Sequence, residues 1–300
     1  MAQGAAIWPR PGRRPPLIQR LTVSRAVLRA GDRVGPYDLP LSPALVRKFA
    51  EATHDTSAPL RDGSLVPPNL LATQIYRAQF AAMAELVPDE VFSAARSGVH
   101  GQHDLLLHRP VTADEHLRTF VETHSTRPSR DNLRVTLHHT TLDDDDSPVA
   151  EQWWTTVLLG TTAEPTGPDL PDYSFSSAGT VPVAEDAVTV DEVMAHRYAA
   201  VSGDHSDHHF SIEGARRSGF DAPFVHGLCT MALCTPVAIM TVGGGDPRRI
   251  RRVAVRLAAP AFLGQDLRVG LFERPDGRFA LEASCGADAV VRNGLVELVG

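Results

Sequence analysis

The chain contains 300 residues, of which 43% are hydrophobic and 22% are charged, and its formal net charge at pH 7 is −7. This length suits one large domain or two joined modules, and the composition is ordinary for a globular protein. The acidic balance argues against a general nucleic-acid-binding protein.

Cysteine usage and hydropathy predict a cytoplasmic protein. The three cysteines form neither a close pair nor an even framework, so we expect reduced, buried thiols at Cys229, Cys234 and Cys285. The longest apolar run, residues 228–242, contains Pro236 and is too short to span a bilayer. No basic leader with an apolar core opens the chain, so we expect neither secretion nor a membrane partner.

Residues 1–30 are basic and rich in proline. Arginines precede the first acidic residue, Asp32, which is a bias also found in organelle-targeting leaders. The prolines interrupt a continuous amphipathic helix, so we favour a flexible basic arm on the surface. The residues concerned are Arg10, Arg13, Arg14, Arg20, Arg25, Arg29, Pro9, Pro11, Pro15 and Pro16.

Two helices and a hairpin are predicted in residues 31–161, the expected first module. Ser42, followed by a proline at the first helical position, predicts an N-capped helix over about 43–52. A longer apolar helix is expected over about 70–86. The acidic run 143–146 predicts a solvated hairpin tip rather than a cation site.

A linker and a second module are predicted in the remainder of the chain. Residues 162–180 are rich in proline, glycine and serine and are the expected linker to a module over 181–300. The segment 189–192 has a capping-box pattern that predicts a helix over about 190–201. Residues 228–242 are apolar on nearly every side and predict a helix buried all round.

The two modules are related to each other by an internal repeat with an offset of about 150 residues. Chance supplies one such match easily, but four in the same order along the chain indicate two related modules in one chain. The matching segments are 49–55 with 198–204, 66–68 with 222–224, 106–110 with 256–260, and 116–118 with 266–268.

The second module carries a constellation typical of acid/base chemistry. Asp204 and His209 lie five residues apart on a glycine-containing loop, where a carboxylate and an imidazole can share one water. Gly227 begins the long apolar helix, and its amide can hold a developing oxyanion. A water, a base and an oxyanion donor suit the addition of water across the double bond of an enoyl thioester, or the reverse reaction.

The stretches 202–210 and 219–228 resemble the pattern S-G-D-x-N-P-x-H, then G-F-x-x-P-I-x-H-G-L, of the MaoC-like hydratase/dehydratase family, the hydratase 2 type of (R)-specific enoyl-CoA hydratase. The resemblance implies an α+β double hotdog fold: two modules, each a buried helix wrapped by an antiparallel sheet. It also implies that Asp204 and His209 bind the reacting water and that the hydroxyacyl product has the (R) configuration.

The chain departs from the family pattern at several positions. Ser206 stands where the family has Asn, which leaves a shorter hydroxyl for binding substrate or water, and Asp207 replaces the usual Pro. In the first module Asp55 matches Asp204, but Leu60 stands where His209 would be. The first module is therefore expected to complete the fold and to shape the acyl pocket without catalysing hydration.

Three further residues are candidates for substrate binding. His226 is expected either to orient the loop or to cap the helix that follows it. Arg249 and Arg252 belong to a basic cluster that would meet the phosphates of coenzyme A or the acidic face of an acyl carrier protein. The alternative is a solvated strand edge whose charges block unwanted pairing.

The sequence therefore predicts a hydratase/dehydratase acting on a thioester of coenzyme A or of an acyl carrier protein, with no other cofactor and no metal. One alternative is a non-catalytic or altered hotdog protein that binds acyl thioesters or a partner subunit, and a third is an acyl thioesterase. A metallohydrolase based on His205, Asp207, His208 and His209 is disfavoured because adjacent histidines point in different directions. Cys229 is expected to be a buried hydrophobe rather than a nucleophile. A monomer and a homodimer are both compatible with the sequence.

Overall fold

The computed structural model describes residues 31–57 and 62–299, so the predicted basic arm at 1–30 lies outside the described residues. The first half of the described chain runs through β1 (Arg33–Leu39), α1 (Pro43–Ala52), α3 (Pro68–Gln74), α4 (Tyr76–Leu86), α5 (Asp89–Ala94), β2 (Ser97–Leu107), β3 (Leu117–Ser129), β4 (Asn132–Leu142) and β5 (Pro148–Leu159).

The second half repeats this succession of elements. It runs through β6 (Ala184–Thr189), α6 (Met194–Ser202), the 3-10 helix η1 (Asp207–His209), α7 (Ile212–Arg217), α8 (Gly227–Thr241), the 3-10 helix η2 (Pro247–Arg249), β7 (Ile250–Leu257), β8 (Asp266–Glu273), β9 (Phe279–Cys285) and β10 (Asp288–Leu298).

The strands form one antiparallel sheet in the order β1-β3-β4-β5-β2-β7-β10-β9-β8-β6. Each half contributes five neighbouring strands. The strand order of the second half is the mirror image of that of the first, so β7 corresponds to β2 and β6 to β1. The halves meet where β2 pairs with β7, and Asp104 lies opposite Ala254 in that pairing. Because these two positions are related by the offset of the sequence repeat, a pseudo-twofold axis passes between them.

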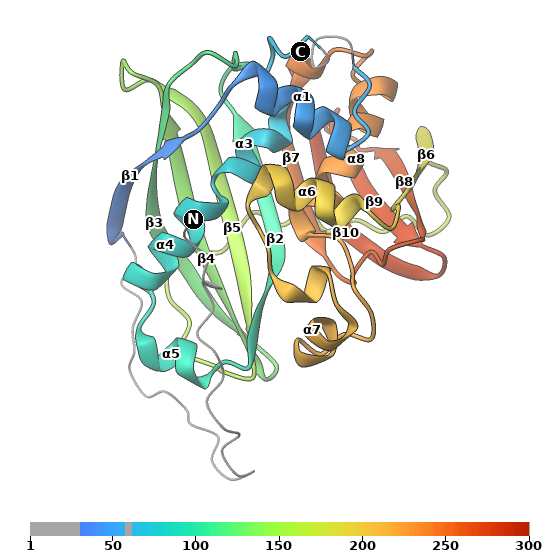
Figure 1. Cartoon of the computed structure of the whole chain (residues 1–300). Helices are drawn as coiled ribbons and strands as arrows, with labels where there is room; N and C mark the ends of the chain where they lie inside the picture. Colours follow the sequence, from blue (N-terminus) through green and yellow to red (C-terminus); the bar gives the residue numbers. More distant parts are fainter. Residues whose placement is uncertain (1–30, 58–61, 300) are drawn as a thin grey trace.

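The helices cover one face of the sheet, and the first helix of each half meets the other across the pseudo-twofold axis (Figure 1). Phe49 of α1 and Tyr198 of α6 are matched positions of the repeat, and their rings lie 6.2 Å apart. Two modules, each with a buried helix wrapped by an antiparallel sheet, are the arrangement expected of an α+β double hotdog.

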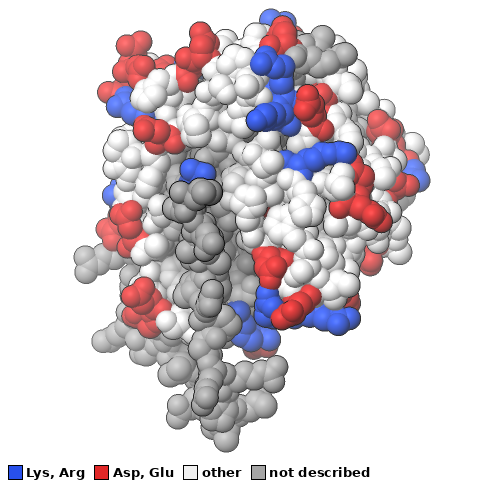
Figure 2. All heavy atoms as spheres, in the orientation of Figure 1, with Lys and Arg blue, Asp and Glu red and all other residues white. Residues whose placement is uncertain are grey.

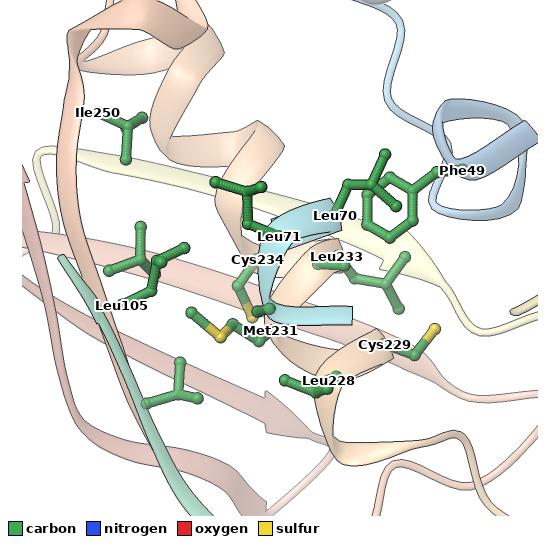
Figure 3. Close-up of a cluster of buried hydrophobic side chains, with 14 of the residues drawn as sticks. Phe49, Leu70, Leu71, Leu105, Leu228, Cys229, Met231, Leu233, Cys234 and Ile250 are labelled. Carbon is green, nitrogen blue, oxygen red and sulfur yellow. The ribbon is translucent and has the colours of Figure 1, made fainter. Parts of the chain in front are cut away.

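The main hydrophobic core lies where α3 and α8 pack together over the centre of the sheet (Figure 3). Leu70 and Leu71 of α3 face Met231 and Leu233 of α8, and all four are at most 1% exposed. Burying a side chain of this size stabilises the fold by about 1.5–3 kcal/mol. Helix α8 is buried over most of its length, as predicted, because it contacts α3 as well as strands of both halves; its last turn, where Met240 is 55% exposed, reaches solvent.

Local capping follows the sequence in the first half. The hydroxyl of Ser42 accepts a hydrogen bond from the Leu45 amide at 3.1 Å, so the predicted N-cap of α1 is confirmed. The acidic residues 143–146 form the predicted tip between β4 and β5. The Asp143 carboxylate there accepts the amides of Asp145 and Ser147.

The single helix predicted over 70–86 is instead two helices, α3 and α4, that meet at Ile75. The Thr73 hydroxyl donates to the Asn69 carbonyl oxygen at 2.8 Å and also lies 2.7 Å from the Tyr198 hydroxyl. Threonine bonds of this kind to the preceding turn bend helices. The new direction of α4 places Tyr76, its first residue, at the module interface.

The capping box predicted at 189–192 is wrong. Thr189 is the last residue of β6, and its hydroxyl donates to the Asp266 carboxylate of β8 at 2.7 Å. Helix α6 begins only at Met194, after Asp191 has accepted the Val193 amide in a turn. Strand pairing between β6 and β8 therefore takes the residues that local propensity assigned to a helix start.

The surface that carries the helices shows acidic and basic side chains interspersed (Figure 2). Among the described helices, none combines the length and the apolarity that crossing a bilayer requires. Three cysteines are free and buried, as the sequence predicted.

A buried ion pair lies at the pseudo-twofold axis, on the sheet face opposite the helices. Both oxygens of the Asp104 carboxylate accept hydrogen bonds from the Arg252 guanidinium at 2.8 Å, and Asp104 also accepts the Tyr173 hydroxyl at 2.9 Å. The Asp104 side chain is 1% exposed, so its charge depends on these partners rather than on water. Tyr173 belongs to the segment between the modules, which this contact holds against the sheet.

We predict that Arg252→Met lowers the free energy of unfolding by about 3–5 kcal/mol, because it leaves the Asp104 carboxylate buried without a cation. Urea denaturation measures the loss. The control is Arg251→Met: its side chain is 55% exposed and pairs with Glu297 at 3.3 Å, so the expected loss is at most about 1 kcal/mol. Equal losses in the two variants would contradict this account of the buried pair.

Candidate active site

The loop that follows α6 presents the carboxylate of Asp204. Gly203 ends the helix with a positive φ of 74°, a conformation that favours glycine, and turns the chain into the loop. Oδ1 of Asp204 then accepts the Ser206 amide at 3.0 Å and the Ser206 hydroxyl at 2.6 Å. These two bonds fix the carboxylate and leave its other oxygen, Oδ2, for the site.

Oδ2 of Asp204 lies 3.8 Å from Nε2 of His209. His209 donates a hydrogen bond from Nδ1 to the Phe224 carbonyl oxygen at 2.8 Å, so its Nε2 carries the free lone pair. The separation is too long for a direct hydrogen bond. Both atoms are instead placed to contact one small molecule that lies against them, such as a water.

His226 supports this loop from the start of α8. Its Nε2 donates to the Asp204 carbonyl oxygen at 3.0 Å, and its ring stacks on that of His209 with centroids 3.7 Å apart. Its side chain makes no capping hydrogen bond to the helix. Of the two roles left open by the sequence, the geometry favours the one that orients the loop.

Gly227 begins α8, so its amide N–H is not used by the helix itself. A Cβ atom at this position would lie 2.5 Å from Cδ1 of Leu257 and 3.2 Å from Cβ of His100. Packing therefore requires a residue without a side chain here, and Gly227 lines the cavity beside the acid/base pair. The positive end of the α8 dipole adds to the attraction for negative charge.

Burial sets the protonation states of the pair. It lowers the pKa of His209 to about 3, and the neighbouring imidazole of His226 acts in the same direction. Burial opposes ionisation of Asp204, but the imidazoles of His226 and His209 and the hydrogen bonds from Ser206 outweigh it and lower the pKa of Asp204. Near neutral pH the site therefore holds a carboxylate beside a neutral imidazole, and both can accept a proton.

A cavity of about 210 Å³ opens beside this pair and is lined by both modules. Asp204, His209 and Gly227 lie in its wall. From the first module it is lined by apolar and aromatic side chains that include Phe80, Met83 and Trp154. The chamber thus has a polar end in the second module and an apolar wall in the first.

Two residues of the first module reach the site without any signal in the sequence motif. The Tyr76 side chain lines the cavity beside Asp204 and Ser206; burial, the Asp204 charge and a hydrogen bond to that carboxylate raise its pKa. His100 stacks on Trp154 at 4.2 Å and donates from Nε2 to the Gln102 carbonyl oxygen. Burial lowers the pKa of His100, so its Nδ1 is a lone-pair acceptor close to the start of α8.

The predicted substrate-binding residues divide into two groups. Ser206 and His226 line the cavity, although the Ser206 hydroxyl is donated to Asp204. Arg249 and Arg252 are not among the residues that line it, which corrects the sequence-based expectation. Arg252 alternates to the outer face of the sheet and is held by Asp104, and Arg249 ends the 3-10 helix η2.

The pseudo-twofold axis relates this site to a vestige in the first module. Asp55 accepts the Ser57 amide at 3.0 Å and hydroxyl at 2.7 Å, which repeats the turn at Asp204. However, α3 begins at Pro68, which has no N–H to offer, and the matching cavity measures about 10 Å³. Leu60, the residue predicted to replace the histidine, lies outside the described residues.

The donor set does not favour a metal ion. Among the described residues, Asp204, His209 and His226 form the group whose ligand atoms lie close enough to share an ion. The two imidazole planes are stacked within 29° of each other, and each ring already uses one nitrogen on a backbone carbonyl, which disfavours shared tetrahedral coordination. Asp207 and His208 are engaged elsewhere: Asp207 pairs with Arg217, and His208 stacks on Phe224.

Comparison with known proteins agrees with this geometry. The family model described as MaoC like domain matches residues 174–277, which contain the loop and the start of α8. The 3-hydroxyacyl-thioester dehydratase Y of Mycobacterium tuberculosis is 31% identical over 141 residues, 45% of this chain and 46% of that protein. The 3-hydroxyacyl-thioester dehydratase X of the same organism is 26% identical over 257 residues, 85% of this chain and 82% of that protein.

Among solved structures, the MaoC-like dehydratase from Phytophthora capsici shares the fold with a TM-score of 0.75 at 18% identity, over 88% of this chain and 95% of that one. The chain is therefore a double hotdog protein of the α+β class, as predicted. The match of residues 174–277 to the MaoC like domain model confirms the resemblance drawn from the motif. The chain spans less than half the length of the first curated relative named above.

We predict that burial of His209 lowers the free energy of unfolding at acid pH. Its ordinary pKa is about 6.5, and the folded value is about 3 because of burial. Below about pH 6.5 His209 binds a proton in the unfolded chain but stays neutral in the folded chain. The free energy of unfolding therefore falls as the pH drops from there toward about 3. Urea denaturation at a series of pH values should show a shallower fall for His209→Gln. His205→Gln, an exposed neighbour, should keep the wild-type slope; parallel curves for all three proteins would contradict the assignment.

Proposed function

We propose that this protein is a hydratase/dehydratase that interconverts a 2-enoyl thioester and an (R)-3-hydroxyacyl thioester. The observation that carries the proposal is that Asp204, His209 and Gly227 line one cavity, with Asp204 Oδ2 3.8 Å from His209 Nε2. The MaoC like domain over the same residues supports it, as do two relatives that are named 3-hydroxyacyl-thioester dehydratases.

In the hydration direction, the thioester carbonyl oxygen accepts a hydrogen bond from Gly227, where negative charge develops as an enolate forms. A water held by Asp204 and His209 bonds through oxygen to Cβ, and its proton passes to the pair. The pair returns a proton to Cα on the same face, so atoms and charge balance. An oxyanion donor of this kind contributes about 3–4 kcal/mol to the transition state.

The first module supplies the acyl wall in this proposal. Phe80, Met83 and Trp154 give the apolar surface that an acyl chain requires, and they lie across the cavity from the acid/base pair. The thioester carrier is coenzyme A or an acyl carrier protein, and the reaction uses no other cofactor. We place the protein in the cytoplasm on the basis of its free, buried cysteines. Both a monomer and a homodimer are compatible with the proposal.

Two features argue for an enzyme over a binding protein with the same fold. A non-catalytic relative would be expected to have a broken pair or a filled pocket. Here the Asp204–His209 separation is 3.8 Å and the cavity of about 210 Å³ is open beside it. By contrast, the cavity at the matching position of the first module measures only about 10 Å³, because side chains fill it.

We predict that the purified protein hydrates 2-enoyl-CoA substrates and that Asp204→Asn and His209→Ala each lower kcat by about 10²–10⁴, because each removes a proton-transfer group. Loss of the conjugated double bond is followed by its ultraviolet absorbance. His205→Ala, on the same loop but exposed, should retain wild-type turnover.

The outcomes of this assay separate the alternatives. Turnover on carrier-protein thioesters alone would identify the carrier. Release of free thiol with the double bond intact would identify a thioesterase. No turnover on either carrier would reject the hydratase and favour a protein that binds acyl thioesters.

We predict that Tyr76→Phe lowers kcat about tenfold with little change in KM, the typical effect of losing one hydrogen bond to a charged group. Removing a donor beside the Asp204 carboxylate raises its pKa, so the acid limb of the pH–rate profile should move to higher pH. Tyr198→Phe is the matched control, because the Tyr198 hydroxyl also lies in the site wall but bonds to Thr73. A profile that moves equally in both variants would refute a role for Tyr76 in positioning Asp204.

A further inference from the structure

A second cavity, of about 330 Å³, lies on the outer face of the sheet, opposite the helices and the candidate active site. Its floor is formed by side chains of β4, β2 and β7, among them Arg134, Gln102 and Arg256. Its roof is formed by residues 169–173 of the segment that joins the modules. Trp154 and Thr156 line the inner cavity, while Thr155 between them alternates to the outer face and bonds to Thr136 of the outer cavity, so the sheet separates the two cavities.

The roof is fixed at both ends. Arg127 donates to the carbonyl oxygens of Thr166 and Gly167 and to the Asp169 carboxylate. At the other end the Tyr173 hydroxyl is held by the buried Asp104. The cavity is therefore bounded by anchored backbone rather than by a loose loop.

Two guanidinium groups line this cavity without a direct ion pair to any carboxylate of the described residues. Among the described residues, neither Arg134 nor Arg256 takes part in an ion pair within 4.0 Å, and Arg134 bonds to the neutral Gln102 amide oxygen at 2.9 Å. Two acids of the roof lie near these cations, but neither forms an ion pair with Arg134 or Arg256: Asp169 pairs with Arg127 and is 84% exposed, and Asp172 accepts the Ser174 amide and hydroxyl.

The surroundings of Arg134 oppose its charge. Burial lowers the pKa of Arg134, and the nearby cations Arg256 and Arg127 lower it further, which outweighs the opposite effect of the Asp169 carboxylate. A cation held under these conditions gains from an anion more than an exposed arginine does, because the interaction is less screened. Asn293, at a bulge of β10 with a φ of 49°, adds an amide to the same wall.

We infer that this outer cavity binds a small molecule that carries a phosphate group, held by Arg134 and Arg256. Guanidinium groups bind phosphate oxygens in pairs of parallel hydrogen bonds, which lysines cannot reproduce. Since a water occupies about 30 Å³, the cavity of about 330 Å³ has room for an organic group beside the phosphate. This site is independent of the proposed hydratase activity.

The test is isothermal titration calorimetry of the full chain with inorganic phosphate and, separately, with glycerol 3-phosphate, at constant ionic strength. We expect saturable binding, with Arg134→Gln and Arg256→Gln each weakening it at least about tenfold. Arg292→Gln is the matched control: Arg292 pairs with Arg256 across β10 and β7 and is exposed, but it does not line the cavity. Its affinity should equal that of the wild type.

The ester and the free ion distinguish the source of the phosphate. Tighter binding of the ester would assign the organic group to the cavity, and equal binding would assign free phosphate. No saturable binding of either, an equal loss in Arg292→Gln, or equally tight binding of succinate would overturn the proposal. Arg256 is exposed, so its variant should keep the wild-type circular dichroism spectrum even where Arg134→Gln loses structure.

Discussion

The pairing of β2 with β7 is the contact on which the rest of the structure depends. It joins two five-stranded halves into one sheet, with Asp104 opposite Ala254 at the pseudo-twofold axis. Because both halves then present their helices on the same face, α3 and α8 meet over the centre of the sheet and share one hydrophobic core. The cavity lies at this junction, so neither half could form it alone.

The two halves have diverged in opposite directions from a common arrangement. Each keeps an aspartate whose Oδ1 accepts the amide and hydroxyl of a serine two residues later. The entry to the following helix is also matched: the Val66 amide bonds to the Val111 carbonyl oxygen, and the Val225 amide to that of Ala261. Past this point one helix begins with Gly227 and an available N–H, and the other with Pro68 and none. The first half therefore contributes packing and a cavity wall, while the second contributes the polar groups.

Burial sets the protonation states of the site and also makes the site energetically unfavourable to form. His209 and His226 are at most 4% exposed, and each uses one ring nitrogen on a backbone carbonyl, which fixes the tautomers. A neutral imidazole beside a carboxylate, both removed from water, is a costly arrangement that the fold maintains through Ser206 and Phe224. The same expense of burying charge recurs at Asp104, where Arg252 offsets it without any part in the cavity.

The sequence by itself determined the features that depend on neighbours along the chain. The cap at Ser42, the hairpin tip at 143–146 and the buried helix near 228–242 follow from local chemistry and spacing. The motif also singled out Asp204, His209 and Gly227, which the structure places in the wall of one cavity, while their roles in catalysis stay a prediction. The repeat offset also predicted two related modules. Only the tertiary structure decided what meets across the interface: Tyr76 and His100 reach the site from the first module, and Arg252 turns away to Asp104. The helix predicted over about 190–201 forms as α6 but begins only at Met194, because Thr189 pairs with Asp266 of β8 instead of capping the helix. Local propensities contribute less free energy than long-range strand pairing and burial, so the tertiary contacts decide where the two conflict.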